Sequence, residues 1–228
     1  MAKITKNSKE DLRQQNMAEA VSKAEQFFNK NGKLITGILI GLLVVVLGYL
    51  GYRFFIKAPK VAQALDDQRQ AEEWLRNNEY ELALKGEEGG ELGFADILDQ
   101  YGSWAGESIY LYTGICQIKT GAFEEAIKTL KKYDGREPNL RSRAQGLIGD
   151  AYVELKDYSN AISFYEKAAK TADSPLAASY LLKAGIVAEE NGDSKKALEY
   201  YYTIKDKWEE APEATEIDKY ITRIETAK

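Results

Sequence analysis

The chain has 228 residues, of which 44% are hydrophobic and 29% charged, and it contains one cysteine and no histidine. The missing histidines remove the commonest general base and metal ligand, and a single cysteine cannot form an internal disulfide, so the composition argues against an enzyme. Residues 58–228 hold 22 basic against 32 acidic side chains, and this acidic balance disfavours binding to nucleic acid.

Residues 1–33 form a polar N-terminal segment with an excess of basic side chains. Apolar positions from Met17 to Phe28 recur at helical spacing, which predicts a short amphipathic helix. Asn31 and Gly32 tolerate the left-handed conformation that ends helices, so the helix is predicted to stop there. We expect the side chains of Phe27 and Phe28 to lie either in a lipid interface or against a partner protein.

Residues 34–56 are predicted to form a transmembrane helix. No residue from Leu34 to Tyr52 is charged, and this stretch spans about 28 Å as a helix, close to the thickness of the hydrocarbon core. Bulky aromatic and basic residues follow it, so we expect an anchor and not a cleaved signal. Gly37 and Gly41 form a GxxxG motif suited to helix packing in lipid, although glycine is frequent in membrane helices generally. Basic residues are balanced across the segment, so charge leaves its orientation open.

Residues 57–102 are predicted to be a helical lead-in to the rest of the chain. A long helix is expected from Val61 to Lys85, followed by a glycine-rich loop and a short helix at residues 93–102. The loop, at residues 85–93, follows no strand, which argues against a phosphate-binding role. Its role stays open.

Residues 103–210 contain an internal repeat with a period of about 35 residues. Each unit has a glycine in its first helix, a turn, and an alanine followed by a large side chain in its second helix. A small residue at each crossing is what two tightly packed antiparallel helices require. The glycines are Gly114, Gly149 and Gly185; the alanines are Ala126, Ala161 and Ala197; the large residues are Leu130, Tyr165 and Tyr201.

This pattern resembles three tetratricopeptide repeats, with residues 211–228 as the expected capping helix. The fold class is therefore all-α: an N-terminal amphipathic helix, one transmembrane helix and a helical solenoid. The resemblance implies a concave protein-binding groove. Its expected lining residues are Leu111, Ile115, Arg143, Asp150, Leu182, Lys183, Ile186 and Glu190.

An alternative interpretation of the apolar groove positions is burial between repeats, which would apply to Leu111, Ile115 and Ile186. The mixture of apolar and charged residues suits an extended peptide or a partner helix better than a small-molecule substrate. Repeat proteins that clamp a C-terminal carboxylate use Lys, Asn and Arg at fixed groove positions. Leu111, Ile115 and Leu147 occupy three of those positions here, so that clamp is not expected.

No sequence motif for catalysis, a cofactor or a metal is present. The chain lacks a P-loop, a GxSxG motif, a CxxC pair and a dinucleotide-binding fingerprint. Acidic pairs such as Asp66-Asp67 diverge by about 100° on a helix and would not converge on one metal ion. We therefore expect no catalytic residue, no cofactor and no bound metal.

The segment EAVSKAEQFFNKNGKLITGILIGLLVVVLGYLGYRFF resembles the start of YfgM-type proteins, which are bacterial ancillary subunits of the Sec translocon. The matching positions include the Phe pair, Asn31-Gly32-Lys33, Gly41, Gly48 and the aromatic-Arg exit at Tyr52 and Arg53. The resemblance implies an inner-membrane protein with a cytoplasmic N-terminus and a periplasmic repeat domain. It also implies two partners, the translocon and a membrane-anchored chaperone of prolyl-isomerase type. The longer N-terminal tail and the glycine-rich loop depart from the family pattern.

Two functions follow from these observations. The first is a non-enzymatic, membrane-anchored adaptor that links the translocon to periplasmic chaperones and aids the biogenesis of secreted or outer-membrane proteins. Its candidates for docking on membrane or translocon are Phe27, Phe28, Gly37 and Gly41. The second is a scaffold for another cell-envelope assembly, because repeat grooves are reused for different partners. An anchored hydrolase has no supporting residues in the sequence.

Overall fold

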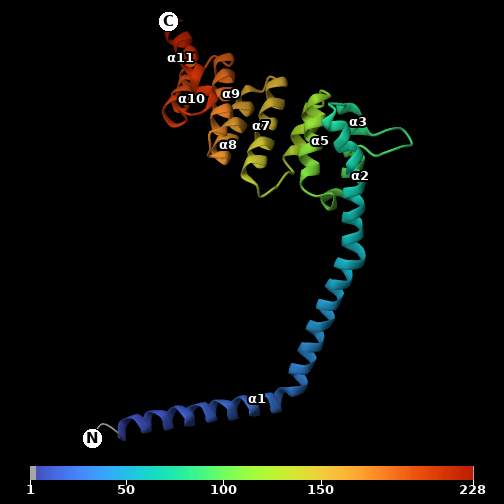
Figure 1. Ribbon diagram of the computed structural model, residues 1–228, viewed down its shortest axis with the longest axis vertical. Helices are drawn as coiled ribbons and strands as arrows, with labels where there is room; N and C mark the ends of the chain where they lie inside the picture. Colours follow the sequence, from blue (N-terminus) through green and yellow to red (C-terminus); the bar gives the residue numbers. More distant parts are fainter. Residues whose placement is uncertain (1–3, 228) are drawn as a thin grey trace. The chain divides into compact units, whose positions relative to one another are not determined.

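The computed structural model describes the backbone of residues 4–227 and the side chains of residues 13–227 (Figure 1). The predicted all-α class with tetratricopeptide repeats is confirmed. In the described part of the chain, β structure is limited to one isolated antiparallel β-bridge between Gly86 and Leu92. The chain divides into two compact units, Met1–Pro59 and Lys60–Lys228.

The first unit is built on one long helix, α1 (Ile4–Gly51). The predicted helix stop at Asn31-Gly32 is wrong, because both residues lie inside α1. The Asn31 side-chain amide donates to the carbonyl of Phe27, four residues back, at 3.1 Å, so it bonds to the helix and does not end it. A glycine inside a helix costs only about 1 kcal/mol, whereas a break would leave several backbone groups without partners. The amphipathic and the apolar segments are therefore parts of one helix.

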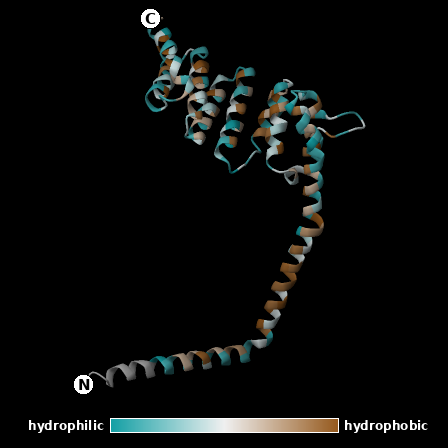
Figure 2. Ribbon diagram, viewed as in Figure 1, coloured by the Kyte–Doolittle hydropathy of each residue, from teal (hydrophilic) through white to brown (hydrophobic). Residues whose placement is uncertain are grey.

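The apolar part of α1 is exposed along its length. Side chains such as Leu39 and Val45 are 62% and 70% exposed, and the segment stands out as a hydrophobic stretch in Figure 2. Within the described residues, one continuous helical stretch, Arg13–Arg76, is long and apolar enough to cross a membrane. Nothing within its own unit covers these side chains.

A π-helix, η1 (Tyr52–Lys57), follows α1 at the point where the sequence predicts the end of the span. The N–H of Ala58 donates to the carbonyl of Arg53, five residues back, which is the π pattern. Pro59 comes next and has no N–H to donate to the carbonyl of Phe55. The wider turn thus lies where the regular α-helical hydrogen-bond pattern is interrupted. Phe55, within this turn, is 84% exposed.

The lead-in of the second unit consists of α2 (Ala58–Arg76), α3 (Tyr80–Lys85), α4 (Phe94–Tyr101) and the 3₁₀ turn η2 (Gly102–Ala105). The single long helix expected from Val61 to Lys85 is interrupted after Arg76. Asn78 adopts a left-handed φ of 63° there, a conformation that Asn tolerates. The break turns α3 back, and Trp74, Phe94 and Ile97 form the centre of a small core.

The glycine-rich loop after α3 is a narrow turn. The N–H of Glu87 donates to the carbonyl of Glu91 at 3.0 Å, beside the bridge between Gly86 and Leu92. A Cβ atom on Gly93 would lie 2.4 Å from the carbonyl oxygen of Leu84, so glycine is required where the two ends of the loop meet.

Three antiparallel helix pairs follow, as the repeat pattern predicts, and they lie side by side in Figure 1. The turn inside each pair has a left-handed residue at the equivalent position: Gly121, Lys156 and Gly192. The pairs are α5 (Ser108–Lys119) with α6 (Phe123–Leu130), α7 (Pro138–Glu154) with α8 (Tyr158–Ala172), and α9 (Leu176–Glu190) with α10 (Ser194–Lys207).

The spacing of small and large residues that recurs in the three repeats produces one close contact inside each helix pair. A Cβ on Gly114 would lie 2.4 Å from Leu130, one on Gly149 would lie 2.6 Å from Tyr165, and one on Gly185 would lie 2.2 Å from Tyr201. The alanines Ala126, Ala161 and Ala197 are fully buried. The helices of each pair are therefore close enough that any side chain at the glycine would collide with its partner.

The chain ends on a 3₁₀ turn, η3 (Pro212–Glu216), and helix α11 (Ile217–Thr226), in the segment for which a capping helix is predicted. Ile217, Ile221 and Ile224 are buried on one face of α11, and the helix packs on α10. Its other face is polar and exposed, which is what the end of a repeat stack requires.

Candidate protein-binding site

The eight residues predicted to line a groove lie on the first helices of the three repeats, and the structure divides them into two groups. Leu111, Ile115 and Arg143 meet at one pocket between the lead-in and the first two repeats. The remaining five, Asp150, Leu182, Lys183, Ile186 and Glu190, lie further along α7 and α9 and do not line that pocket.

We call this cavity the junction pocket. It has a volume of about 410 Å³, within the range of pockets that hold a ligand or a partner's side chains. Residues from α2, α3, α5, α7 and the α6–α7 connection contribute to it. The lining residues are Leu75, Tyr80, Ser108, Leu111, Tyr112, Ile115, Lys119, Tyr133, Leu140 and Arg143.

The apolar floor of the junction pocket comes from one face of α5. Leu111 and Ile115 are four residues apart, so they lie one turn above the other on the same side of the helix. Leu111 is 3% exposed and also belongs to the core, whereas Ile115 is half-buried. The alternative interpretation, burial between helices, is therefore correct for Leu111, but Ile115 retains surface that a partner can contact.

The charged residues that line the junction pocket are both basic. Lys119 places its Nζ atom 5.8 Å from the centre of the Tyr80 ring, and Arg143 is exposed. Among the described residues, no carboxylate lies within ion-pair distance of either side chain. Burial raises the pKa of Tyr133, nearby Glu107 and Glu137 raise it further, and Arg141 lowers it. The hydroxyl is protonated at neutral pH, as that of an ordinary tyrosine is.

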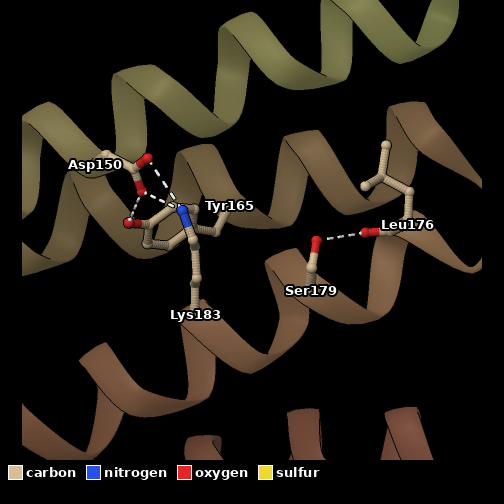
Figure 3. Close-up of polar contacts among 5 residues, drawn as sticks. All are labelled: Asp150, Tyr165, Leu176, Ser179 and Lys183. Atoms are coloured by element: carbon tan, nitrogen blue, oxygen red, sulfur yellow. Dashed lines mark hydrogen bonds and ion pairs between the residues drawn. The ribbon is translucent and has the colours of Figure 1, made fainter. Parts of the chain in front are cut away.

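Asp150 and Lys183 are bound to each other (Figure 3). Lys183 Nζ lies 2.7 and 3.0 Å from the two carboxylate oxygens of Asp150, and the Tyr165 hydroxyl donates to Asp150 Oδ1 at 2.7 Å. Burial is the main reason that the pKa of Tyr165 is raised, and the Asp150 charge adds to it. This cluster joins α7, α8 and α9, so it holds neighbouring repeats together.

The end of the predicted groove on α9 is more exposed. Ile186 is 39% exposed, so burial between repeats does not apply to it, whereas Leu182 packs partly against the core. Glu190 accepts a hydrogen bond from the Tyr158 hydroxyl at 2.8 Å. These positions offer one apolar contact and one anchored carboxylate to a partner.

Sequence reasoning missed the part of the junction pocket that lies outside the repeats. Leu75 and Tyr80 come from α2 and α3, and Tyr133 comes from the connection between α6 and α7. A repeat pattern assigns binding positions only within its own period. The available signal was the apolar and aromatic cluster at the end of the lead-in, which becomes informative only when its packing against α5 is known.

The docking candidates on α1 are exposed. The rings of Phe27 and Phe28 pack edge to face with their centres 6.1 Å apart, and they are 60% and 58% exposed. A Cβ on Gly37 or Gly41 would meet no atom within 4 Å. These glycines therefore leave open surface on the helix.

The titratable groups of the described residues do not assemble into a metal site: no three His, Cys, Asp or Glu side chains come together in that part of the chain. Cys116 is fully buried, and burial raises the pKa of its thiol to about 12. A thiol that stays protonated is a poor nucleophile.

The comparison with protein families agrees with the helix pairs. Residues 147–212 match the family model described as "Tetratricopeptide repeat"; they run from the middle of α7 past the end of α10. The chain therefore contains repeats of the class that presents extended concave surfaces to protein partners.

Two solved structures, both crystal structures of MamA, are similar to this chain. One has a TM-score of 0.50 and 19% identity, and the match covers 68% of this chain and 91% of that one. The other has a TM-score of 0.51 and 18% identity, and the match covers 72% of this chain and 90% of that one. At such identities the likeness is one of fold. No curated protein matched the sequence, so the resemblance to YfgM-type proteins is not confirmed.

Proposed function

We propose that this protein is a membrane-anchored, non-enzymatic adaptor that associates with the Sec translocon and links it to periplasmic chaperones. One observation carries the proposal: a membrane-length helix with exposed apolar side chains belongs to the same chain as tetratricopeptide repeats, and the lead-in and the first two helix pairs line a pocket of ligand size. The resemblance of the N-terminal segment to translocon-associated proteins supports the choice of partners, including a chaperone of prolyl-isomerase type.

The proposed topology has the N-terminus in the cytoplasm, one helix in the bacterial inner membrane and the repeats in the periplasm. Protease added to spheroplasts should digest a tag at the C-terminus and leave a tag at the N-terminus intact. Protection of the C-terminal tag, with digestion after the membrane is dissolved, would place the repeats in the cytoplasm and contradict the periplasmic adaptor.

The open surface at Gly37 and Gly41 supports a contact between α1 and another membrane helix. Gly41→Leu should leave folding of the repeats unchanged, because residue 41 belongs to the other compact unit and a Cβ there meets no atom within 4 Å. It should weaken co-purification with the translocon. Val46→Leu is the matched control, since residue 46 lies about 140° around the helix from residue 41. If both variants co-purify with the translocon as efficiently as the wild type does, the glycine face is not used for this contact.

Photo-crosslinking tests the partners directly. A photoreactive residue at Phe28 should crosslink to a translocon subunit, and one at Ile115 should crosslink to a periplasmic protein. If neither position captures a translocon or chaperone component, the named partners are wrong. Capture of components of one other envelope assembly, with normal protein export after deletion, would favour the scaffold function.

A further inference from the structure

We propose that the junction pocket binds a partner segment in which a bulky apolar side chain is followed closely by a carboxylate. The inference deepens the proposed adaptor function and rests on it. The pocket's volume, its apolar lining and its two basic residues, which have no ion-pair partner among the described residues, carry the proposal.

The first step concerns the apolar part of the ligand. Leu75, Ile115 and Leu140 present apolar surface around the cavity, and Leu140 is 40% exposed. A cavity of about 410 Å³ admits one or two side chains and excludes a folded surface. Interfaces gain most of their affinity from such anchors, which fill desolvated pockets.

The second step concerns charge. Residues 58–228 are acidic overall, yet Lys119 and Arg143 line the pocket and no acidic residue does. Glu107 and Glu137 lie near Tyr133 without lining the cavity, and Arg141 opposes their effect on that hydroxyl. Arg143 is exposed and free of ion pairs within the described chain, so it can form a bidentate pair with a carboxylate. A basic ligand would instead meet two cations beside an apolar floor.

The third step excludes the other half of the groove as the main charge site. Lys183 Nζ forms an ion pair with Asp150 Oδ1 at 2.7 Å, and the Tyr158 hydroxyl donates a hydrogen bond to Glu190. A ligand's charge would have to compete there with the Asp150–Lys183 ion pair, and Glu190, which keeps further acceptor sites, would repel a carboxylate. No described residue competes in this way for Arg143, so the charge preference of the site is set at the junction pocket.

The test uses the full chain in detergent micelles and three fluorescein-labelled octapeptides that differ only in their central four residues. The probe contains Phe-Leu-Asp-Asp, the charge control Phe-Leu-Lys-Lys and the anchor control Ala-Ala-Asp-Asp. Fluorescence anisotropy should show at least tenfold tighter binding of the probe than of either control. Equal binding of the probe and the charge control would overturn the proposal.

Two variants locate the binding to the pocket. Arg143→Glu should weaken binding of the probe at least tenfold and improve binding of the lysine peptide. Ile115→Ala should weaken binding of both peptides that contain Phe-Leu. Lys195→Glu removes an exposed lysine on α10, outside the pocket, and should change nothing. If Lys195→Glu and Arg143→Glu weaken the probe equally, the effect is general electrostatics and the pocket is not the site.

The peptide measurement and the crosslinking measurement fail independently. Specific binding of the probe without capture of translocon or chaperone components would retain the pocket's preference and reject the named partners. Capture of those components at Phe28, with no discrimination among the peptides, would retain the adaptor and reject this preference.

Discussion

At the scale of single residues, the second and third repeats depend on close contacts between a glycine and an aromatic ring. The ring of Tyr165 rests on Gly149 and is fixed by its hydrogen bond to Asp150. It therefore has little freedom to move aside. The same arrangement recurs where Tyr201 rests on Gly185 and bonds to Glu189 at 2.6 Å.

Gly149→Ala should destabilise the folded chain by about 1–2 kcal/mol, because overpacking outweighs the better helix propensity of alanine. Urea unfolding measures the change. In a Tyr165→Ala background the ring is absent, so the same substitution should be neutral or stabilising. An equal cost in both backgrounds would show that the contact with Tyr165 is not its cause.

The buried tyrosines make stability sensitive to alkaline pH. Burial is the largest cause of the raised pKa values of Tyr165, Tyr200 and Tyr201, and a bound carboxylate adds to each. Their ordinary pKa is about 10, so the unfolded chain releases these protons above pH 10 while the folded chain retains them. The stabilisation is complete below pH 10 and is lost as pH rises beyond it.

We expect the free energy of unfolding to fall above pH 10 by about 1.4 kcal/mol per pH unit for each of these tyrosines. Urea unfolding at intervals from pH 9 to 11 measures the slope. Tyr165→Phe keeps the ring on Gly149 and removes the proton, so it should reduce the slope by about that amount per pH unit. An unchanged slope would mean that Tyr165 ionises normally in the folded chain.

At the scale of helices, the three repeats differ in how their second helix begins. The Asp157 side chain accepts from the N–H of Asn160, and Asp193 accepts from the N–H of Lys196. Ala122 occupies the equivalent position before α6 and provides no side-chain cap. The first pair therefore lacks an interaction that both others have.

Ala122→Asn should stabilise the chain by about 1 kcal/mol, since Asn caps a helix without adding charge beside Glu124 and Glu125. Thermal or urea unfolding of the variant measures the gain. Ala122→Gly is the control, because it alters the backbone freedom without adding the side-chain acceptor. A gain no larger for Asn than for Gly would contradict the capping explanation.

The sequence was most informative where a contact recurs with the period of the repeat, about 35 residues. The glycine, alanine and large positions predicted the pairs because each pair buries the same residue types at the same crossing. The continuous helix through Asn31-Gly32 was not predictable from turn propensity, since both residues also fit inside a helix when neighbouring backbone bonds favour it. The junction pocket was not predictable either, because Tyr80 and Arg143 are brought together only by packing of the lead-in on α5.

At the scale of the whole molecule, the helices of the second compact unit form a linear stack in which each helix packs mainly on its neighbours. The last helix in the stack, α11, covers α10 with Ile221 and Ile224. The lead-in helices α3 and α4 pack on α5 at the other end. Stability in such a stack is a sum of local units and the interfaces between them.

Ile221→Asp places a charge in the α10–α11 interface and should loosen the C-terminal end first. Hydrogen exchange should show faster exchange of amides in residues 194–226, with little change in residues 108–130. Exchange that increases uniformly along the repeats would show that they open as one cooperative unit. Peptide binding at the junction pocket serves as a second readout, and it should persist in this variant.

The contact that joins neighbouring repeats has a consequence for how the protein can change in evolution. Tyr180 of α9 rests on Gly146 of α7, one repeat earlier, beside the pair between Lys183 and Asp150. The other repeats do not share this contact, because Ala144 and Leu147 of α7 stand at the positions equivalent to Tyr180 and Lys183 of α9. A copy of the α7–α8 pair inserted before α9 would therefore meet the original α7 without either side chain. Tandem duplication alone would thus leave a weaker junction, and a longer array would also require an aromatic and a basic side chain to be acquired on the new first helix.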